Sequence, residues 1–201
     1  MDKVTNVNDL AVNSNGAVRH IAIDTNVLLW MFYGNVSYVG NARTQQKDYQ
    51  KVLKTFLSNK NVFKLHTTGI NVNEALHVIE KTECEIYNQS IVNGFELTVK
   101  DFRNIPQNKI NLQKTFKLFW QQIVRLIKIE NVSLTKDMVR DYIIQYDRQN
   151  YDSLDFALVR WCQENSINVI MTDDIDFVGN DIGIEILTAN PKALQEYRKS
   201  V

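Results

Sequence analysis

The sequence contains little cysteine and histidine, and this scarcity excludes several kinds of site. Among 201 residues there are only two cysteines and three histidines. Cys84 and Cys162 lie far apart and outside any metal-ligand spacing, so a zinc site of the Cys/His type has almost no material. We therefore expect both to be free thiols, buried or without a function, in a reducing compartment.

The chain also lacks an excess of charge and a long apolar segment. Its 23 basic and 23 acidic residues cancel, so any affinity for nucleic acid must come from local basic patches. No run approaches the roughly 18 consecutive apolar residues of a membrane helix. Residues 1–16 contain no apolar core after a basic patch, as a signal peptide would. We therefore expect a cytoplasmic protein without membrane contact.

Short apolar runs alternate with amphipathic segments along most of the chain. Four runs have the length and composition of buried strands, at residues 21–23, 62–68, 168–172 and 184–188. Helical patterns accompany them at residues 24–32, 47–58, 71–83, 136–147 and 153–165. This alternation predicts an α/β fold with a mostly parallel sheet covered by helices on both faces.

The length of the chain favours one domain with an elaboration over two domains. We expect this domain at residues 19–201, preceded by a mobile lead-in at residues 1–18 that shows no apolar period. Residues from about 84 to 130 interrupt the alternation, and we expect a helical insertion there. Within it, an apolar stripe from Leu112 to Ile127 predicts a helix.

Carboxylates follow the predicted strands at one edge of the sheet. In open parallel sheets, ligands bind beyond the carboxyl ends of the strands. Asp24 directly follows the first strand, and Glu74 lies at the start of the helix after the second. Asp174 follows the third strand, and Asp155 lies in the first turn of the helix that leads into that strand. Four segments therefore bring a carboxylate to one rim.

Each carboxylate also has an ordinary structural role open to it. Asp24 and Asp152 are placed to cap helices, and Glu74 to complement a helix dipole. The acids after the third strand could form a polar turn. Asp155 differs, because at roughly 100° per residue it falls inside the buried arc of its helix, whereas Asp152 falls at the border. An isolated buried charge is very costly, so Asp155 needs a metal ion or a basic residue as its partner.

A set of four carboxylates suits one kind of chemistry. Mg²⁺ and Mn²⁺ are hard cations that prefer oxygen ligands and keep several waters. Such ions lower the pKa of a bound water, align it and stabilise the leaving oxygen of an in-line displacement. No Ser or Cys nucleophile with a His base and no glycine-rich phosphate loop is evident. The set therefore predicts hydrolysis by a metal-activated water.

These segments resemble the PIN-domain family of ribonucleases. The likeness covers about residues 20–82 and 130–190, and its most specific parts are IAIDTNVLLW and SLDFALVRWCQENSINVIMTDDIDF, whereas NEAL is weak. The resemblance implies that the catalytic and metal-binding acids are Asp24, Glu74, Asp155 and Asp174. The supporting positions in the same segments are Thr25, Asn26, Asp152, Thr172 and Asp176.

The resemblance implies an α/β/α sandwich, dependence on Mg²⁺ or Mn²⁺, and endonucleolytic cleavage of single-stranded RNA, as in toxin-type or RNA-processing nucleases. Many members are toxins held by an antitoxin protein and many form homodimers, so both kinds of partner are implied as well. The chain departs from compact toxin-type members in two respects. It has the additional segment at about residues 84–130, and Asp173 fills a position that is often basic in relatives.

Two other classes of function fit parts of the pattern. A haloacid-dehalogenase-type phosphatase would use Asp24 as a covalent nucleophile, but it usually needs a second Asp two residues on, where this chain has Asn26. A PIN-like module without catalysis would keep a degenerate acidic rim that binds RNA, a protein or a structural ion. An assay for RNA cleavage with Mn²⁺, run beside one for hydrolysis of a small aryl phosphate, distinguishes the three.

A protein without net charge needs a local basic surface to hold RNA. Lys114, Lys117 and Arg125 recur at helical spacing on the predicted insertion helix, opposite its apolar stripe. They form either an ordinary solvated face or a strip that tracks the RNA backbone beside the acidic pocket. The sequence is compatible with both interpretations.

Overall fold

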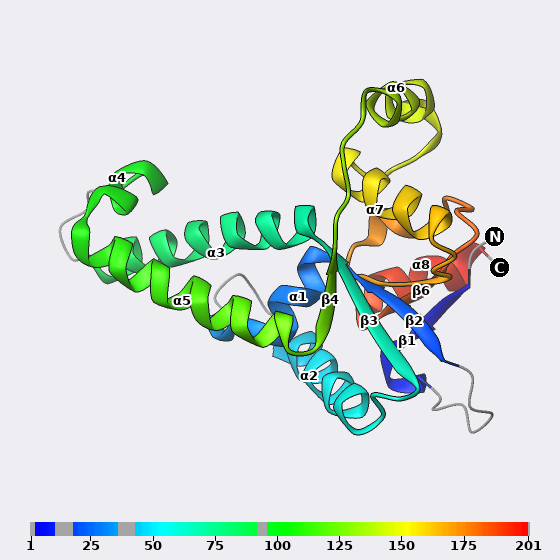
Figure 1. Cartoon of the computed structure of the whole chain (residues 1–201), viewed down its shortest axis with the longest axis horizontal. Coiled ribbons are helices and arrows are strands. Elements are labelled where there is room, and N and C mark those ends of the chain that lie inside the picture. The colour runs from blue at the N-terminus through cyan, green and yellow to red at the C-terminus, as the bar shows by residue number, and fades with distance from the viewer. Residues whose placement is uncertain (1–2, 11–17, 36–42, 92–95, 201) are drawn as a thin grey trace.

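The sheet at the centre of the molecule has six strands, and all neighbouring pairs are parallel (Figure 1). The computed structural model describes residues 3–10, 18–35, 43–91 and 96–200. The strands are β1 (Val4–Asn6), β2 (Arg19–Ile23), β3 (Phe63–Thr68), β4 (Ile127–Glu130), β5 (Val169–Met171) and β6 (Glu185–Thr188). They lie in the order β1-β6-β5-β2-β3-β4, so the predicted parallel sheet is confirmed.

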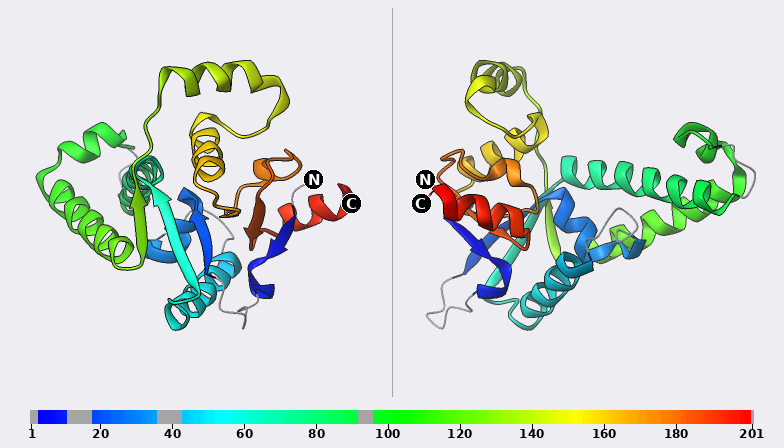
Figure 2. Two further views of the ribbon diagram at one scale, coloured as in Figure 1. Left: turned by 45° about the vertical axis from the view of Figure 1, so that its right-hand side comes forward. Right: turned by 180° about the vertical axis from the view of Figure 1, so that it is seen from behind.

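Helices cover both faces of the sheet and give the expected α/β/α sandwich (Figure 2). The helices are α1 (Thr25–Phe32), α2 (Arg43–Ser58), α3 (Gly69–Ser90), α4 (Val99–Asn104), α5 (Pro106–Val124), α6 (Lys136–Gln145), α7 (Ser153–Glu164) and α8 (Pro191–Ser200). Because side chains alternate along a strand, Ile21 and Ile23 pack with α1, α2, α3 and α5, whereas Ala22 faces α7 and α8. None of the described helices is long and apolar enough to cross a membrane.

The N-terminal residues belong to the sheet, so the expectation of a lead-in outside the domain is wrong for them. β1 pairs with β6, with Val4 opposite Ile186 and Asn6 opposite Thr188. The short helix η1 (Val7–Asp9) follows, and Val7 is buried in the main core. A strand of three residues is too short to show an apolar period, which is why the sequence pattern misses it. Residues 11–17 of the predicted lead-in lie outside the described residues.

The predicted insertion departs from expectation at its C-terminal end. Its long helix, α5, ends at Val124 and does not continue to Ile127. Ile127 instead begins β4, which pairs with β3 at the edge of the sheet. Leu126 and Ile127 happen to continue the helical spacing of apolar residues, and this coincidence hides the strand. On the same face of the sheet, α2 begins at Arg43, earlier than the start expected at Lys47.

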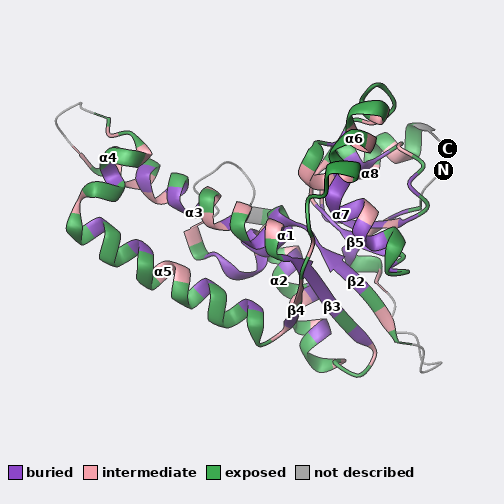
Figure 3. Ribbon diagram, turned by 45° about the horizontal axis from the view of Figure 1, so that its top comes forward, coloured by how far each residue is buried: buried purple, intermediate pink, exposed green. Residues whose placement is uncertain are grey.

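Helices α3, α4 and α5 form an arm that extends away from the sheet (Figures 1 and 3). A small separate core holds its tip together and contains Cys84, Phe102 and Leu112. At the base of the arm, Phe119 and Ile123 of α5 are buried in the main core. The arm is therefore built into the domain at its base, while most of α5 is exposed.

Shortening Ile123 tests how strongly α5 contributes to the main core. Ile123 is fully buried, so we expect Ile123→Val to lower the free energy of unfolding by about 1 kcal/mol. The same change at Ile110, which lies on the same helix and is 48% exposed, should alter it by less than about 0.5 kcal/mol. Denaturant unfolding of both variants measures the difference. Equal effects would mean that α5 is only loosely attached.

Candidate active site

The site begins with Asp24, the first residue after β2. Its carboxylate caps α1 and accepts a hydrogen bond of 2.6 Å from the backbone N–H of Thr25. Its own N–H donates to the carbonyl of Met171 on β5 over 3.0 Å, which fixes Asp24 between two neighbouring strands. Asp24 is only 3% exposed, so this carboxylate lies inside the protein.

Two buried side chains orient the Asp24 carboxylate. The Thr172 hydroxyl donates to its Oδ2 over 2.8 Å, and the Asn71 amide donates to its Oδ1 over 3.3 Å. Thr172 was expected as a supporting residue, whereas the sequence analysis missed Asn71. Asn71 lies in the first turn of α3, which Thr68 caps. This spacing marks a helix start, but nothing in the sequence tells that the amide turns toward Asp24.

Thr25 connects Asp24 with Glu74. Its hydroxyl donates to Oε2 of Glu74 over 2.6 Å and accepts from the amide of Asn71 over 3.0 Å. Glu74 lies near the start of α3 and is half-buried. The structure thus brings Asp24, Thr25 and Glu74 together. Asn26 is exposed, and its side chain forms no hydrogen bond with a described residue.

Asp152 and Asp155 lie at the start of α7 in different surroundings. Asp152 is the exposed N-cap, and its carboxylate accepts from the N–H groups of Leu154 and Asp155 over 2.8 and 3.0 Å. Asp155 is half-buried, and its pKa is raised to about 9. Burial is the largest cause of this rise, and the negative charges of Asp24, Asp152, Asp174 and Glu74 contribute in that order. Asp155 therefore lies near the other predicted acids, while Asp152 has the structural role of a cap.

Asp24 experiences the same combination of burial and repulsion. Its pKa is raised to about 7, mainly by burial and to a smaller extent by the charges of Glu74 and Asp174. Hydrogen bonds from Thr172 and Thr25 oppose this rise because they stabilise the ionised form. The site thus holds carboxylates that cannot all be ionised near neutral pH without a compensating positive charge.

Asp174 lies in the turn after β5, directly before the short helix η4 (Ile175–Phe177). It caps η4 by accepting from the N–H of Asp176 over 2.9 Å, and its own N–H donates to the Thr172 hydroxyl over 3.0 Å. Thr172 therefore holds both Asp24 and Asp174 in place. Asp176 is exposed at the border of this group, and burial together with the charges of Asp174 and Asp152 raises its pKa.

Asp173 turns away from this group toward α2. It accepts hydrogen bonds from the Tyr49 hydroxyl over 3.0 Å and from the Gln45 amide over 3.2 Å. Burial raises its pKa to about 6, although the hydrogen bond from Tyr49 opposes the rise. The carboxylate of Asp173 therefore contacts α2, although the charge of Asp174 still contributes to raising its pKa.

The two adjacent acids should consequently respond differently to removal. We expect Asp173→Ala to lower the free energy of unfolding by about 1–3 kcal/mol, because it removes the charged one of the two acceptors of the buried Tyr49 hydroxyl, the other being the Thr172 carbonyl. Asp174→Ala should change stability less and lower activity more. Thermal unfolding measures the loss of stability in both variants, and a cleavage assay measures their loss of activity. A larger loss of activity in Asp173→Ala and a larger loss of stability in Asp174→Ala would show that Asp173, and not Asp174, belongs to the active site.

No positive side chain compensates the acidic group. Within the described residues, no lysine, arginine or histidine forms an ion pair with Asp24, Glu74, Asp155 or Asp174. Among the described residues, Asp155 thus has no basic residue as its partner. A cation from solution is the remaining kind of partner.

The donor set fits Mg²⁺ or Mn²⁺ by type, since all its atoms are hard oxygens. Among the described residues, however, no three His, Cys, Asp or Glu side chains are placed to hold one ion together. Mg²⁺ usually binds through one or two carboxylates and keeps several waters. The group therefore fits an ion held by two carboxylates and water better than one enclosed by protein ligands.

The expected basic strip lies in a different place from the acids. Lys114 and Lys117 are exposed on α5, along the arm. Arg125 ends this helix just before β4, so it lies at the edge where the parallel strands begin, whereas the acids lie where the strands end. A groove of about 640 Å³ instead adjoins the acidic group. Residues that line this groove include Asn73, Glu74, His77, Ser133 and Leu154.

Comparison of the sequence with models of known protein families gave no match, and comparison with curated proteins gave none either. A functional assignment therefore depends on the side chains of this site and on their surroundings.

Proposed function

We propose that the chain is a metal-dependent endoribonuclease that hydrolyses single-stranded RNA at the acidic site. The observation that carries this proposal is the convergence of Asp24, Glu74, Asp155 and Asp174 from separate segments, without an ion pair to any positive side chain among the described residues. Buried carboxylates that repel one another are costly to maintain, and a divalent cation removes that cost. The resemblance of the same segments to PIN domains supports the choice of RNA as substrate.

Asp24 and Asp155 are the residues best placed to hold the ion, with Asp174 and Glu74 acting directly or through water. When bound, Mg²⁺ or Mn²⁺ supplies an activated water and stabilises charge on the leaving oxygen. The protein's own contribution is orientation. Thr172 and Asn71 fix the two oxygens of Asp24, and Thr25 fixes Glu74, so the carboxylates need little rearrangement when the ion arrives.

The surroundings of Asp24 argue against the phosphatase alternative. A covalent nucleophile must approach the phosphorus atom of the substrate directly, whereas a small cation needs only one of the lone pairs that the protein leaves free on a carboxylate. Asp24 is almost fully buried, and both of its oxygens accept hydrogen bonds from the protein. The second acid that such chemistry needs is also missing, because Asn26 occupies that position and is exposed.

The proposal is tested by incubating the purified chain with unstructured RNA and Mn²⁺ and mapping the new ends by sequencing. Cleavage that requires Mn²⁺ and leaves a small aryl phosphate intact supports the nuclease. Mn²⁺ binding without any cleavage would instead favour a module without catalysis. Hydrolysis of the aryl phosphate would favour a phosphatase.

Calorimetry with Mn²⁺ tests the ligand assignment separately from catalysis. We expect Asp24→Asn to weaken Mn²⁺ binding by roughly 100-fold, since loss of even an outer-shell partner commonly costs 10- to 100-fold. Asp137→Asn is a suitable control, because Asp137 is an exposed acid on α6 that pairs with Arg140 and is not among the charges that raise the pKa of Asp24 or Asp155. Equal affinity in the wild type and Asp24→Asn would remove Asp24 from the metal site.

A further inference from the structure

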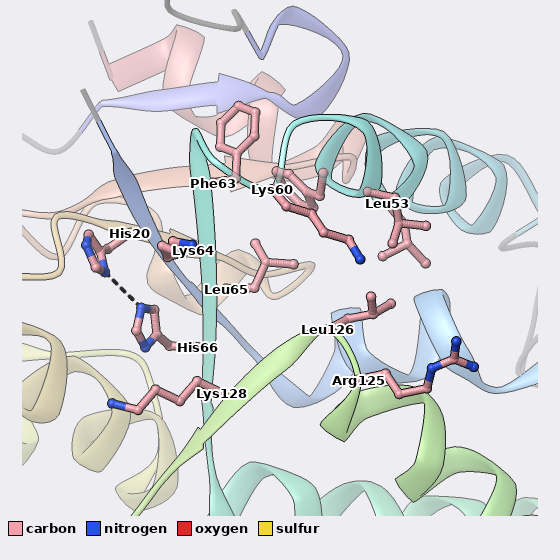
Figure 4. A pocket seen from close by; sticks show the side chains of 12 residues that line it. His20, Leu53, Lys60, Phe63, Lys64, Leu65, His66, Arg125, Leu126 and Lys128 are labelled. Carbon is pink, nitrogen blue, oxygen red and sulfur yellow. Dashed lines mark hydrogen bonds between the residues drawn. The ribbon is translucent and has the colours of Figure 1, made fainter. Parts of the chain in front are cut away.

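A second hollow lies at the edge of the sheet where the strands begin, opposite to the acidic site (Figure 4). Its volume is about 450 Å³, and it is bounded by α2, β3 and the turn from α5 to β4. β4 pairs with β3 only from Leu65 to Thr68. The first part of β3 therefore has no β4 residue beside it, and the hollow occupies that space.

One wall of the hollow is aliphatic and accessible. Leu57 is 40% exposed at the end of α2, and Leu53 and Leu126 are half-buried on the two sides of the hollow. Buried residues, among them Phe56 and Phe63, support this wall from behind. The wall thus offers apolar surface to a ligand without unfolding any element.

Three basic side chains lie beside this aliphatic wall without an ion pair to a described residue. Lys60 extends from the end of α2 toward Leu126, Arg125 lies at the α5 side of the hollow, and Lys64 lies on β3 (Figure 4). None of these three forms an ion pair with a described residue. The residues that line the hollow also include no Asp or Glu. An anion is therefore the complementary group.

The other polar groups of the hollow are already partnered. Nζ of Lys128 lies 2.8 Å from the Glu130 carboxylate, which also contacts Nδ1 of His66 at 3.0 Å. Nε2 of His66 lies 2.9 Å from Nδ1 of His20. Glu130, His66 and His20 thus form a chain in which charge and hydrogen bonds are satisfied internally. The uncompensated charge is confined to Lys60, Lys64 and Arg125.

We propose that this hollow binds a phosphate monoester that carries an aliphatic chain. A phosphate group has three oxygens and up to two negative charges, so it can accept hydrogen bonds from several cations, and the fork of an arginine matches it well. Lys60 and Arg125 hold the phosphate, and the chain lies against Leu53, Leu57 and Leu126. The volume falls within the range of about 300–1,000 Å³ that is usual for small-molecule sites.

The test measures binding of hexyl phosphate by calorimetry, beside inorganic phosphate, hexan-1-ol and adenosine monophosphate. We expect hexyl phosphate to bind at least tenfold more tightly than each of the other three probes. Lys60→Gln with Arg125→Gln should weaken this binding by tenfold or more. The matched control is Lys54→Gln with Lys128→Gln, because Lys54 lies outside the hollow and Lys128 is already paired. It should change the affinity by less than twofold.

A second variant separates the apolar contribution from the charge. Leu57→Gln should weaken binding of hexyl phosphate several-fold and leave binding of inorganic phosphate unchanged. Because Leu57 is exposed, the folded state should tolerate this substitution. Equal losses in the two double variants would overturn the proposal, as would tighter binding of adenosine monophosphate. Loss of RNA binding in Lys60→Gln with Arg125→Gln, with hexyl phosphate binding retained, would assign these cations to RNA instead.

Discussion

Asp155→Asn is expected to lower metal-dependent RNA cleavage by roughly 100-fold or more, which corresponds to about 2.7 kcal/mol of transition-state stabilisation. Asparagine has the size of a neutral carboxyl group but cannot ionise to bind a cation. Because burial and repulsion raise the pKa of Asp155 to about 9, the carboxyl is already neutral at pH 7 in the metal-free protein. The variant should therefore keep its fold while it loses activity.

Asp152→Asn provides the matched control for this result. Asp152 is three residues from Asp155, exposed, and occupied with capping α7. Asparagine caps helices about as well as aspartate, so activity should fall only a few-fold and stability should hardly change. Initial rates of RNA cleavage at saturating Mn²⁺ compare the two variants. An inactive Asp152→Asn beside an active Asp155→Asn would place the essential acid at the helix cap.

The second large effect concerns the stability of the metal-free protein against pH. Asp24 and Asp155 have folded-state pKa values of about 7 and about 9, above the value of 3.8 for a free aspartate. Between pH 4 and 9 the folded state therefore binds more protons than the unfolded state, so stability falls as pH rises. The lowered pKa values of Glu130 and Glu185 act below this window, where stability falls as pH decreases.

Mn²⁺ should reverse this loss, because it binds the ionised carboxylates of the folded state. At a concentration of 100 times its Kd, an ion that binds only the folded state adds about 2.7 kcal/mol. For a chain of this size that corresponds to a rise in Tm of roughly 5–10 °C. Scanning calorimetry should find this rise at pH 8 and a much smaller one at pH 5.5. A rise of the same size at both pH values, or one that persists in Asp24→Asn, would show that the ion binds elsewhere.

The central strands and the main acids could be predicted from the sequence because their signals are local. Apolar runs such as residues 21–23 mark buried strands, and an acid directly after such a run must lie at the carboxyl edge of a parallel sheet. The position of Asp155 in the buried arc of α7 was equally readable, and the structure confirms that it is half-buried. Local sequence patterns were thus sufficient to predict the central strands and the acids that follow them.

Features that depend on distant partners could not be predicted in this way. β1 exists because it pairs with β6, and β4 because it pairs with β3, and neither strand is long enough to show a period of its own. The amide of Asn71 reaches Asp24 only after α3 packs beside α1. The carboxylate of Asp173 is directed by Tyr49, a residue of a distant helix. Such contacts arise from tertiary packing and leave no pattern in a single sequence.

The order of the strands has a consequence for the synthesis of the protein on the ribosome. β5 lies between β6 and β2 in the sheet, yet it is made long after β2 and β3. Until Val169–Met171 has left the ribosome, one edge of β2 has no neighbour, and an open strand edge invites pairing with other chains. Thr172 and Asp174 emerge only after that strand. A nascent chain that carries Asp24 alone therefore cannot assemble the proposed site until translation has passed Asp174.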